Sequence, residues 1–81
     1  MGSPGIAIIF SFLRRHIEMD GLSADEDLFA AGYVNSLFAL QLIAFVEKTF
    51  GVTVEDEDLD IANFRSAQAI DQFVQRKIDL L

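Results

Sequence analysis

The amino-acid sequence predicts a small all-α fold, a four-helix bundle with three main helices, one short helix and a long first loop. Its 81 residues suffice for one hydrophobic core. A hydrophobic content of 52%, with eight Phe, favours a folded chain over a disordered one. Apolar residues also recur at helical spacing in three separate segments. We expect residues 1–5 to be a flexible start or a remnant of cloning, and residues 6–81 to form one domain.

The first predicted helix runs from Ile6 to about Glu18. Basic side chains near its end suit the negative pole of the helix dipole, and His16, the single histidine, is interpreted as a solvated residue there. The residues expected on its core face follow the i, i+3, i+4, i+7, i+11 pattern and are Ile6, Ile9, Phe10, Leu13 and Ile17.

A long connection follows, from Asp20 to Asn35. Ser23 and Glu26 have the spacing of a capping box, which predicts a helical turn near 24–29. Gly32 permits a backbone conformation that other residues resist. The apolar residues expected to pack this loop onto the core are Leu22, Leu28 and Phe29.

The second predicted helix has clear boundaries, because Asn35 is a good N-cap and Gly51 is a good residue just beyond the C-terminus. Leu37, Phe38, Leu40 and Phe45 lie outside its core stripe, so the helix has more apolar surface than one core contact needs. Phe38 and Phe45 share a face, as core residues or as a partly exposed docking patch. The core stripe itself comprises Ala39, Leu42, Ile43, Val46 and Phe50.

The rest of the chain contains an acidic cluster, a short turn from Leu59 to Asn63, and a last helix capped by Ser66. An EF-hand is excluded, because Ile61 stands where its loop needs Gly and Ala67 where it needs a bidentate Glu. The cluster is interpreted as a solvated loop or a weak divalent-ion binder, and no metal site is expected. The residues expected to face inward on the last helix are Ile70, Phe73, Val74 and Ile78.

Composition excludes several classes of function. A net charge of −7 disfavours binding to nucleic acids and to anionic membranes. The apolar segment 6–13 is too short to span a bilayer. The absence of Cys excludes disulfides and any thiol chemistry of the chain's own. We expect a cytoplasmic monomer.

Ser36 stands at the start of the apolar second helix. Serine catalysis is disfavoured, because His16 lies on another predicted element and no nucleophile-elbow motif surrounds Ser36. A serine at a helix start commonly satisfies backbone donors, but Asn35 can already do so. A helix N-terminus also suits a phosphate. The position therefore permits a phosphodiester-linked serine without requiring one.

The segment "DLFAAGYVNSLFALQLIAFVEKTFGVTVEDEDL" (27–59) resembles the acyl carrier protein family, and the resemblance extends over about residues 6–79. The shared pattern is an apolar-Gly loop, an Asp-Ser-Leu signature opening the second helix, a Phe-Gly end and an acidic loop. The resemblance implies an acyl-carrier-like bundle that is not an enzyme. It further implies that a phosphopantetheinyl transferase attaches 4′-phosphopantetheine to Ser36, between Asn35 and Leu37, and that the arm holds acyl groups as thioesters.

Two departures from the family pattern stand out. Asn35 replaces the usual Asp, which keeps the cap but removes a charge beside the phosphate. Gly32 lies four residues before Ser36 rather than three, a spacing similar to that of D-alanine carriers.

The segment "VNSLFALQL" is similar to free-standing carriers of hydroxymalonyl, methoxymalonyl or aminomalonyl extender units. This resemblance implies a role in polyketide or hybrid polyketide/nonribosomal peptide (antibiotic) biosynthesis, with acyl-loading, tailoring and acyltransferase or synthase enzymes as partners. Two alternatives remain open: a carrier for an adenylated amino acid, and a helical interaction module in which Ser36 is only structural. The residues expected to dock partners are Leu37, Phe38, Gln41, Phe45, Glu47 and Lys48.

Overall fold

The computed structural model describes residues 4–16, 23–30, 32 and 35–80, with the backbone alone for Pro4 and Ser36. The predicted all-α fold is confirmed, since the described residues form four α-helices and a short 3₁₀ turn, without a strand. Ile17, Glu18 and Leu22, to which the sequence assigned roles, lie outside these residues. The elements are α1 (Pro4–His16), α2 (Ser36–Phe50), η1 (Asp56–Asp58), α3 (Ile61–Phe64) and α4 (Ala67–Asp79).

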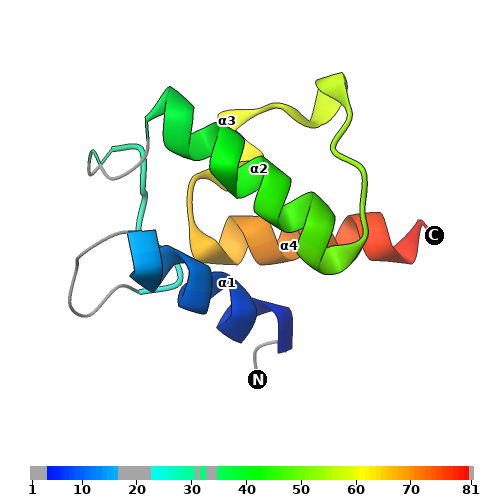
Figure 1. Cartoon of the computed structure of the whole chain (residues 1–81), viewed down its shortest axis with the longest axis horizontal. Coiled ribbons are helices and arrows are strands. Elements are labelled where there is room, and N and C mark those ends of the chain that lie inside the picture. The colour runs from blue at the N-terminus through cyan, green and yellow to red at the C-terminus, as the bar shows by residue number, and fades with distance from the viewer. Residues whose placement is uncertain (1–3, 17–22, 31, 33–34, 81) are drawn as a thin grey trace.

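The last helix organises the bundle, because α1, α2 and α3 all pack against α4 (Figure 1). The segment between α2 and α4 arches away from the bundle and carries η1 and α3. One hydrophobic core lies between the helices. The largest fully buried side chains in it are Phe73, Ile9, Leu13, Leu28, Leu42, Ile70, Val46 and Val74.

The inward face of α1 differs in part from the prediction. Phe12 is buried, whereas Phe10 is only partly buried at the edge of the core. Almost every side chain of this segment is apolar, so spacing alone cannot decide which ones turn inward. Stacking decides, because the Phe12 ring lies 4.1 Å from the Phe45 ring, centroid to centroid. The helix also starts earlier, at Pro4, which the first turn of a helix tolerates.

The helical turn predicted near 24–29 is absent, and this segment forms hydrogen-bonded turns instead. Glu26 N–H donates to the Ser23 carbonyl at 3.2 Å. Two backbone groups bond outside the segment: Leu28 N–H donates to the Arg65 carbonyl at 2.7 Å, and the Ala24 carbonyl accepts from Gln68 N–H at 2.8 Å. The prediction was wrong because tertiary partners at the α3–α4 corner take up backbone groups that a local helix would use.

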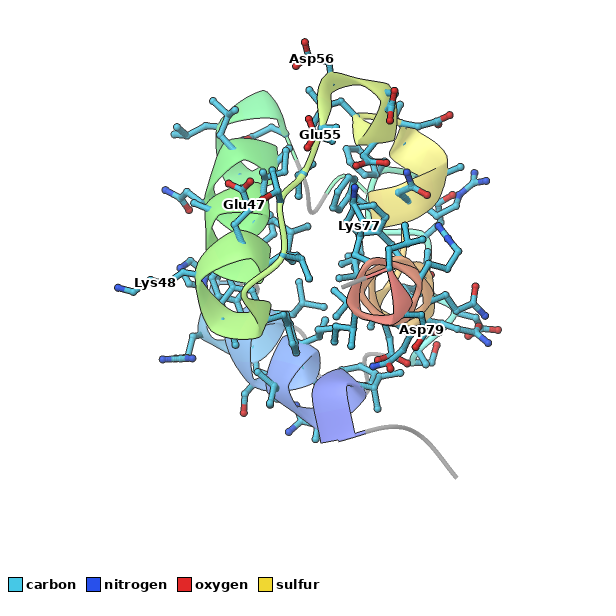
Figure 2. The ribbon with its side chains drawn as sticks, turned by 90° about the vertical axis from the view of Figure 1, so that its right-hand side faces the viewer. Glu47, Lys48, Glu55, Asp56, Lys77 and Asp79 are labelled. Carbon is cyan, nitrogen blue, oxygen red and sulfur yellow. The ribbon has the colours of Figure 1, made fainter. Side chains whose placement is uncertain are left out.

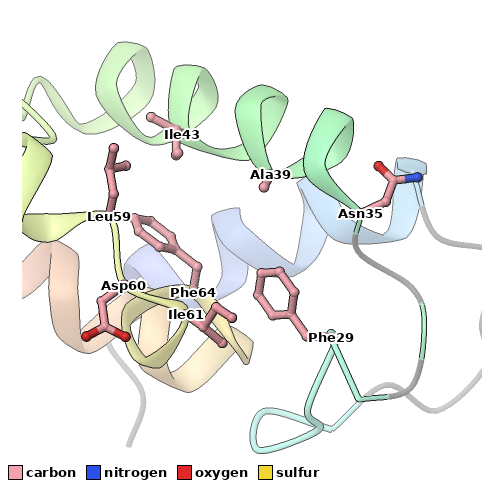
Figure 3. Close-up of a pocket in the computed structure, with 8 residues that line it drawn as sticks. All are labelled: Phe29, Asn35, Ala39, Ile43, Leu59, Asp60, Ile61 and Phe64. Atoms are coloured by element: carbon pink, nitrogen blue, oxygen red, sulfur yellow. The ribbon is translucent and has the colours of Figure 1, made fainter.

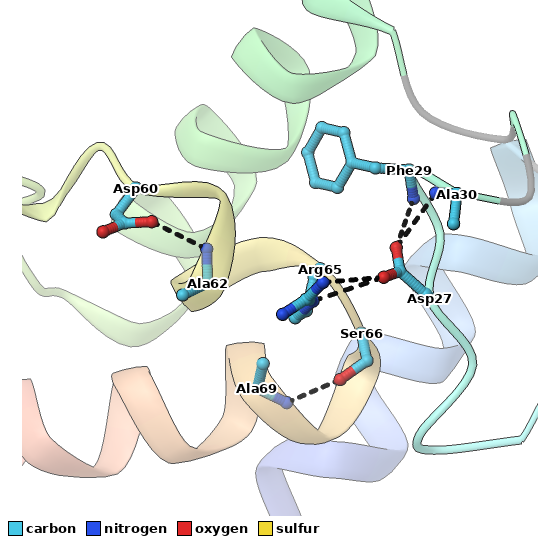
Figure 4. A network of polar contacts seen from close by, with 8 residues as sticks. All are labelled: Asp27, Phe29, Ala30, Asp60, Ala62, Arg65, Ser66 and Ala69. Carbon is cyan, nitrogen blue, oxygen red and sulfur yellow. Dashed lines mark hydrogen bonds and ion pairs between the residues drawn. The ribbon is translucent and has the colours of Figure 1, made fainter.

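Asp27 joins this loop to the same corner (Figure 4). One carboxylate oxygen accepts hydrogen bonds from Phe29 and Ala30 N–H, at 3.1 and 3.0 Å. The other accepts from the Arg65 guanidinium, with Nη2 at 3.0 Å. The Ala30 N–H bond, aided by Arg65, holds the pKa of Asp27 below its ordinary value. Asp27 therefore fixes the turn that carries Phe29.

The C-terminal helix follows the prediction except at its end. The Ser66 hydroxyl accepts a hydrogen bond from Ala69 N–H at 3.1 Å, which confirms the predicted cap. Ile70, Phe73 and Val74 are buried as expected. Ile78 is 38% exposed, so its predicted inward position is wrong. It lies in the last turn of α4, beyond the stretch that the other helices cover (Figure 1).

Two leucines of α2 allow a matched test of this packing. Leu42 is fully buried and Leu40 is 66% exposed. Leu42→Ala should lower the free energy of unfolding by about 2–5 kcal/mol, since it removes buried methyl groups and leaves a cavity. Leu40→Ala should change it by less than about 0.5 kcal/mol. Urea unfolding followed by circular dichroism measures both, and equal losses would contradict the assigned faces of α2.

Candidate functional site

The start of α2 is fixed by the side chain of Asn35. Its Oδ1 accepts a hydrogen bond from Phe38 N–H at 2.9 Å, and its carbonyl accepts one from Ala39 N–H at 2.9 Å. The predicted N-cap is thereby confirmed. Ser36 is the first residue of the helix. At the other end of α2, Gly51 has a φ of 68°. This is the left-handed conformation expected of the glycine that was predicted to follow the helix.

Phe38 anchors this helix start to the core. It is 9% exposed, and its ring stacks on Phe12 with the centroids 5.8 Å apart. The exposed His16, at the end of α1 as predicted, stacks on the Phe38 ring and makes a tilted contact with the Phe12 ring. Its Nδ1 lies 2.9 Å from the Phe12 carbonyl oxygen. The first turn of α2 is therefore held by packing against α1 as well as by its cap.

The electrostatics at the helix start favour an anion. A helix of 15 residues presents the positive end of its dipole at the N-terminus, where the first N–H groups lack intrahelical partners. No acidic residue occupies the first turn of α2. A phosphate group attached near Ser36 would therefore meet a favourable potential.

A cleft of about 420 Å³ opens beside this helix start (Figure 3). Its α2 wall consists of Asn35, Ala39 and Ile43, which places one end of the cleft one residue before Ser36. The opposite wall is mostly apolar, and Asp60, whose Oδ1 accepts a hydrogen bond from Ala62 N–H, is its charged residue. The residues of that wall are Phe29, Leu59, Asp60, Ile61 and Phe64.

The outward side of α2 is solvent-exposed and forms a continuous face. Leu37 and Leu40 are 67% and 66% exposed. Helical spacing of three and four residues aligns them with Gln41, Ala44 and Lys48, all of which are exposed. We call these five residues the outer face of α2.

The structure separates the six residues expected to dock partners. Leu37, Gln41 and Lys48 lie on the outer face. Phe38 is a core residue, and Phe45 is half-buried against Phe12, so the alternative that placed this pair in the core describes them better than a docking patch.

The sixth of these residues, Glu47, is engaged within the chain. Its Oε2 accepts a hydrogen bond from Val54 N–H at 2.9 Å, in the segment that follows α2. Its carboxylate is therefore turned from the outer face toward that segment (Figure 2).

Two features of the site were not predicted. Leu40 was expected outside the core stripe, but neither Leu40 nor Ala44 was included among the docking residues, although both share helical spacing with Leu37 and Lys48. The cleft could not be foreseen in this way, because its walls come from three segments distant along the chain.

The acidic segment after α2 is tied to the end of the bundle. The Asp58 carboxylate pairs with Lys77 of α4 and accepts a hydrogen bond from Glu55 N–H at 2.9 Å. The Lys77 contact, followed by that N–H, lowers the pKa of Asp58 below its ordinary value. Among the residues that the structure describes, no group of three or more His, Asp or Glu side chains could hold a metal ion.

Comparison with known proteins identifies a family. A family model described as a phosphopantetheine attachment site matches residues 9–72, which include α2, α3, the cleft and the first half of α4. No curated protein matches the chain in a sequence search. Within the described part of the chain, no helix has both the length and the apolar character needed to cross a membrane.

The Asn35 cap gives a prediction for the stability of the helix start. Asn35→Ala should lower the free energy of unfolding by about 1 kcal/mol, because Phe38 N–H loses its side-chain acceptor. Asn35→Asp keeps an acceptor oxygen at this position and should stay within about 0.5 kcal/mol of the native chain. Urea unfolding of the three proteins measures the difference. An Asn35→Ala protein as stable as the native one would show that the cap does not hold the helix.

Proposed function

We propose that Ser36 carries a phosphopantetheine arm, because the chain belongs to the family of domains with a phosphopantetheine attachment site. Members of this family bear a covalently attached 4′-phosphopantetheine. The protein is thus a carrier, and phosphopantetheinyl transferase and biosynthetic enzymes are the partners of such domains. The observation that carries the assignment is the place of Ser36 as the first residue of α2, directly after the Asn35 cap.

The surroundings of Ser36 fit such a group. The Asn35 side chain accepts the hydrogen bond from Phe38 N–H, so the first turn of α2 does not need the Ser36 hydroxyl as its cap. The dipole of α2 favours the phosphate of the arm. The chain also has no Cys, and the arm supplies the thiol on which an acyl group is held as a thioester.

The protein's own residues position and present this arm. Asn35 caps the helix start and the buried Phe38 packs it against the core, which places the proposed attachment point relative to the core. The cleft beside Asn35 offers an apolar surface of Ala39, Ile43 and Phe64 to a group that extends from Ser36. In this account Ser36 is a substrate of the transferase, so it requires no catalytic base in the chain.

Within this role, the cargo that we propose is an unusual polyketide extender unit, in polyketide or hybrid polyketide/nonribosomal peptide biosynthesis. The resemblance of "VNSLFALQL" to free-standing carriers of such units supports it. The outer face of α2 supports it too, because the acids that fatty-acid carriers usually display there are missing. Of the six residues expected to dock partners, we propose that Leu37, Gln41 and Lys48 contact the partner enzymes.

Loading with coenzyme A tests the attachment site. A broad-specificity phosphopantetheinyl transferase should add one phosphopantetheine mass to the native chain and none to Ser36→Ala, as measured by intact mass spectrometry. Ser11→Ala, which alters an exposed serine of α1, should be loaded like the native chain. If the native chain gained no mass, the proposed function would be wrong, and the alternative of a helical interaction module would replace it. A loaded Ser36→Ala would place the arm on another residue.

The cargo is tested on protein isolated together with the enzymes of its own pathway. Mass spectrometry of the arm should find a malonyl-type group with a hydroxyl, methoxy or amino substituent. The spacing of Gly32 from Ser36 favours a second candidate, a carrier for an adenylated amino acid. An aminoacyl arm loaded by an adenylating enzyme would replace the extender-unit proposal with that candidate and leave the attachment site unchanged.

A further inference from the structure

The wall of the cleft opposite α2 includes a segment that we call the strap, residues 55–64, which contains η1 and α3. At its end Phe64 is buried, and its ring centroid lies 5.2 Å from that of Phe73 in α4. Leu59 and Ile61 are more than half exposed, and η1 contains no buried residue. Apolar burial therefore holds α3 in place but contributes little to holding η1. The strap residues that line the cleft are Leu59, Asp60, Ile61 and Phe64.

Polar side chains of α4 hold η1 instead. The Lys77 ammonium pairs with the Asp58 carboxylate, and Figure 2 shows Lys77 reaching from α4 toward the strap. Arg76 Nη2 donates a hydrogen bond to Asn63 Oδ1 at 3.0 Å, and Asn63 Nδ2 donates one to the Asp58 carbonyl at 2.9 Å. We call these four residues the clasp. The clasp joins both η1 and α3 to the last turns of α4.

The Lys77–Asp58 pair is better shielded from water than the Arg65–Asp27 pair. Its two side chains are 17% and 19% exposed, against 53% and 34% for Arg65 and Asp27. Screening by water and salt is therefore weaker at the clasp. Lys77 also packs against the core, because its Nζ lies 5.9 Å from the centre of the Phe73 ring. The pair consequently restrains the strap more than an exposed ion pair would.

The charge of the strap makes this restraint necessary. Asp58 is one of five acidic residues between 55 and 60. Without Lys77, its partly buried carboxylate would lack a counter-charge and would lie among four like charges. Hydration would then favour a strap that moves away from α4 into water. Leu59 and Ile61 belong to the strap, so this movement would open the cleft.

We propose that Lys77 is a positioning residue for the cargo: through Asp58 it clasps the strap to α4, and the clasped strap keeps water from a group that lies in the cleft. This inference rests on the proposed function, because the group in the cleft is the one that the arm on Ser36 carries. Lys77 is not a residue of the cleft lining, so its effect is transmitted by the strap.

Hydrogen exchange of the apo protein, followed by mass spectrometry, tests the clasp. The backbone N–H groups of Asp58, Leu59 and Asn63 donate hydrogen bonds within the strap, so their exchange reports its local opening. Lys77→Met removes the charge and keeps a long side chain, and it should speed exchange of residues 55–64 at least about fivefold. Exchange of residues 42–46 in α2 should stay within about twofold of native, which separates local opening from unfolding.

Three further variants serve as controls. Lys77→Arg keeps a cation and should restore native exchange of the strap. Arg15→Met is the matched control, since it removes one positive charge from an exposed position on α1, away from the strap (Figure 1), and it should exchange like the native chain. Asp58→Asn should act like Lys77→Met, and the double variant should exchange no faster than the faster single variant, because both remove the same contact. Native exchange in Lys77→Met, or multiplied effects in the double variant, would overturn the clasp.

The lifetime of a thioester on the arm tests the shielding. From butyryl-coenzyme A, a broad-specificity transferase should join the butyryl-bearing phosphopantetheine to the Ser36 oxygen, which loses its proton, and release adenosine 3′,5′-bisphosphate. At about pH 8.5 the thioester should hydrolyse at least about threefold faster on Lys77→Met than on the native chain, Lys77→Arg or Arg15→Met, as measured by intact mass. Equal lifetimes on Lys77→Met and the native chain would overturn the shielding. If the native chain were not loaded at all, the proposed function itself would fall, and exchange of the apo protein would still decide the clasp.

Discussion

The hydrogen bond from Phe38 N–H to Asn35 Oδ1 is the constraint on which the functional end of the molecule depends. It starts α2 at Ser36, and the buried side chains of Phe38, Leu42 and Val46 fix the rotation of the helix against the core. Phe38 then packs against Phe12, and Ala39 and Ile43 face the cleft. Leu37 and Leu40 remain exposed as a consequence. The cap and this packing together determine where the proposed attachment point, the cleft and the outer face lie relative to one another.

The wall of the cleft opposite α2 depends on a second set of contacts. Asp27 holds the turn that carries Phe29 and also contacts Arg65, before the start of α4. Both partners of this ion pair are partly exposed, so its Coulomb energy is small. Its role is geometric, together with the Leu28–Arg65 backbone bond. These contacts bring segments far apart in the chain to one end of the bundle.

Most of the fold could be predicted from local signals. Asn35, Gly51 and Ser66 marked helix ends correctly, because capping preferences act within a few residues. Errors arose where distant partners decide the outcome. In the segment near 24–29, Leu28 N–H and the Ala24 carbonyl bond to the α3–α4 corner instead of forming a local helix, and Phe12 replaces Phe10 through stacking on Phe45. The pattern within one segment likewise could not predict the cleft or the hydrogen bond from Val54 N–H to Glu47.

The central claim is that a capped helix start presents Ser36, among the chain's five serines, as the attachment point for the arm. Tandem mass spectrometry of peptides from transferase-loaded protein tests it most directly, because fragmentation assigns the arm to one residue. The account predicts the phosphopantetheine mass on Ser36 alone. The same mass on Ser11, Ser23 or Ser66 would contradict it.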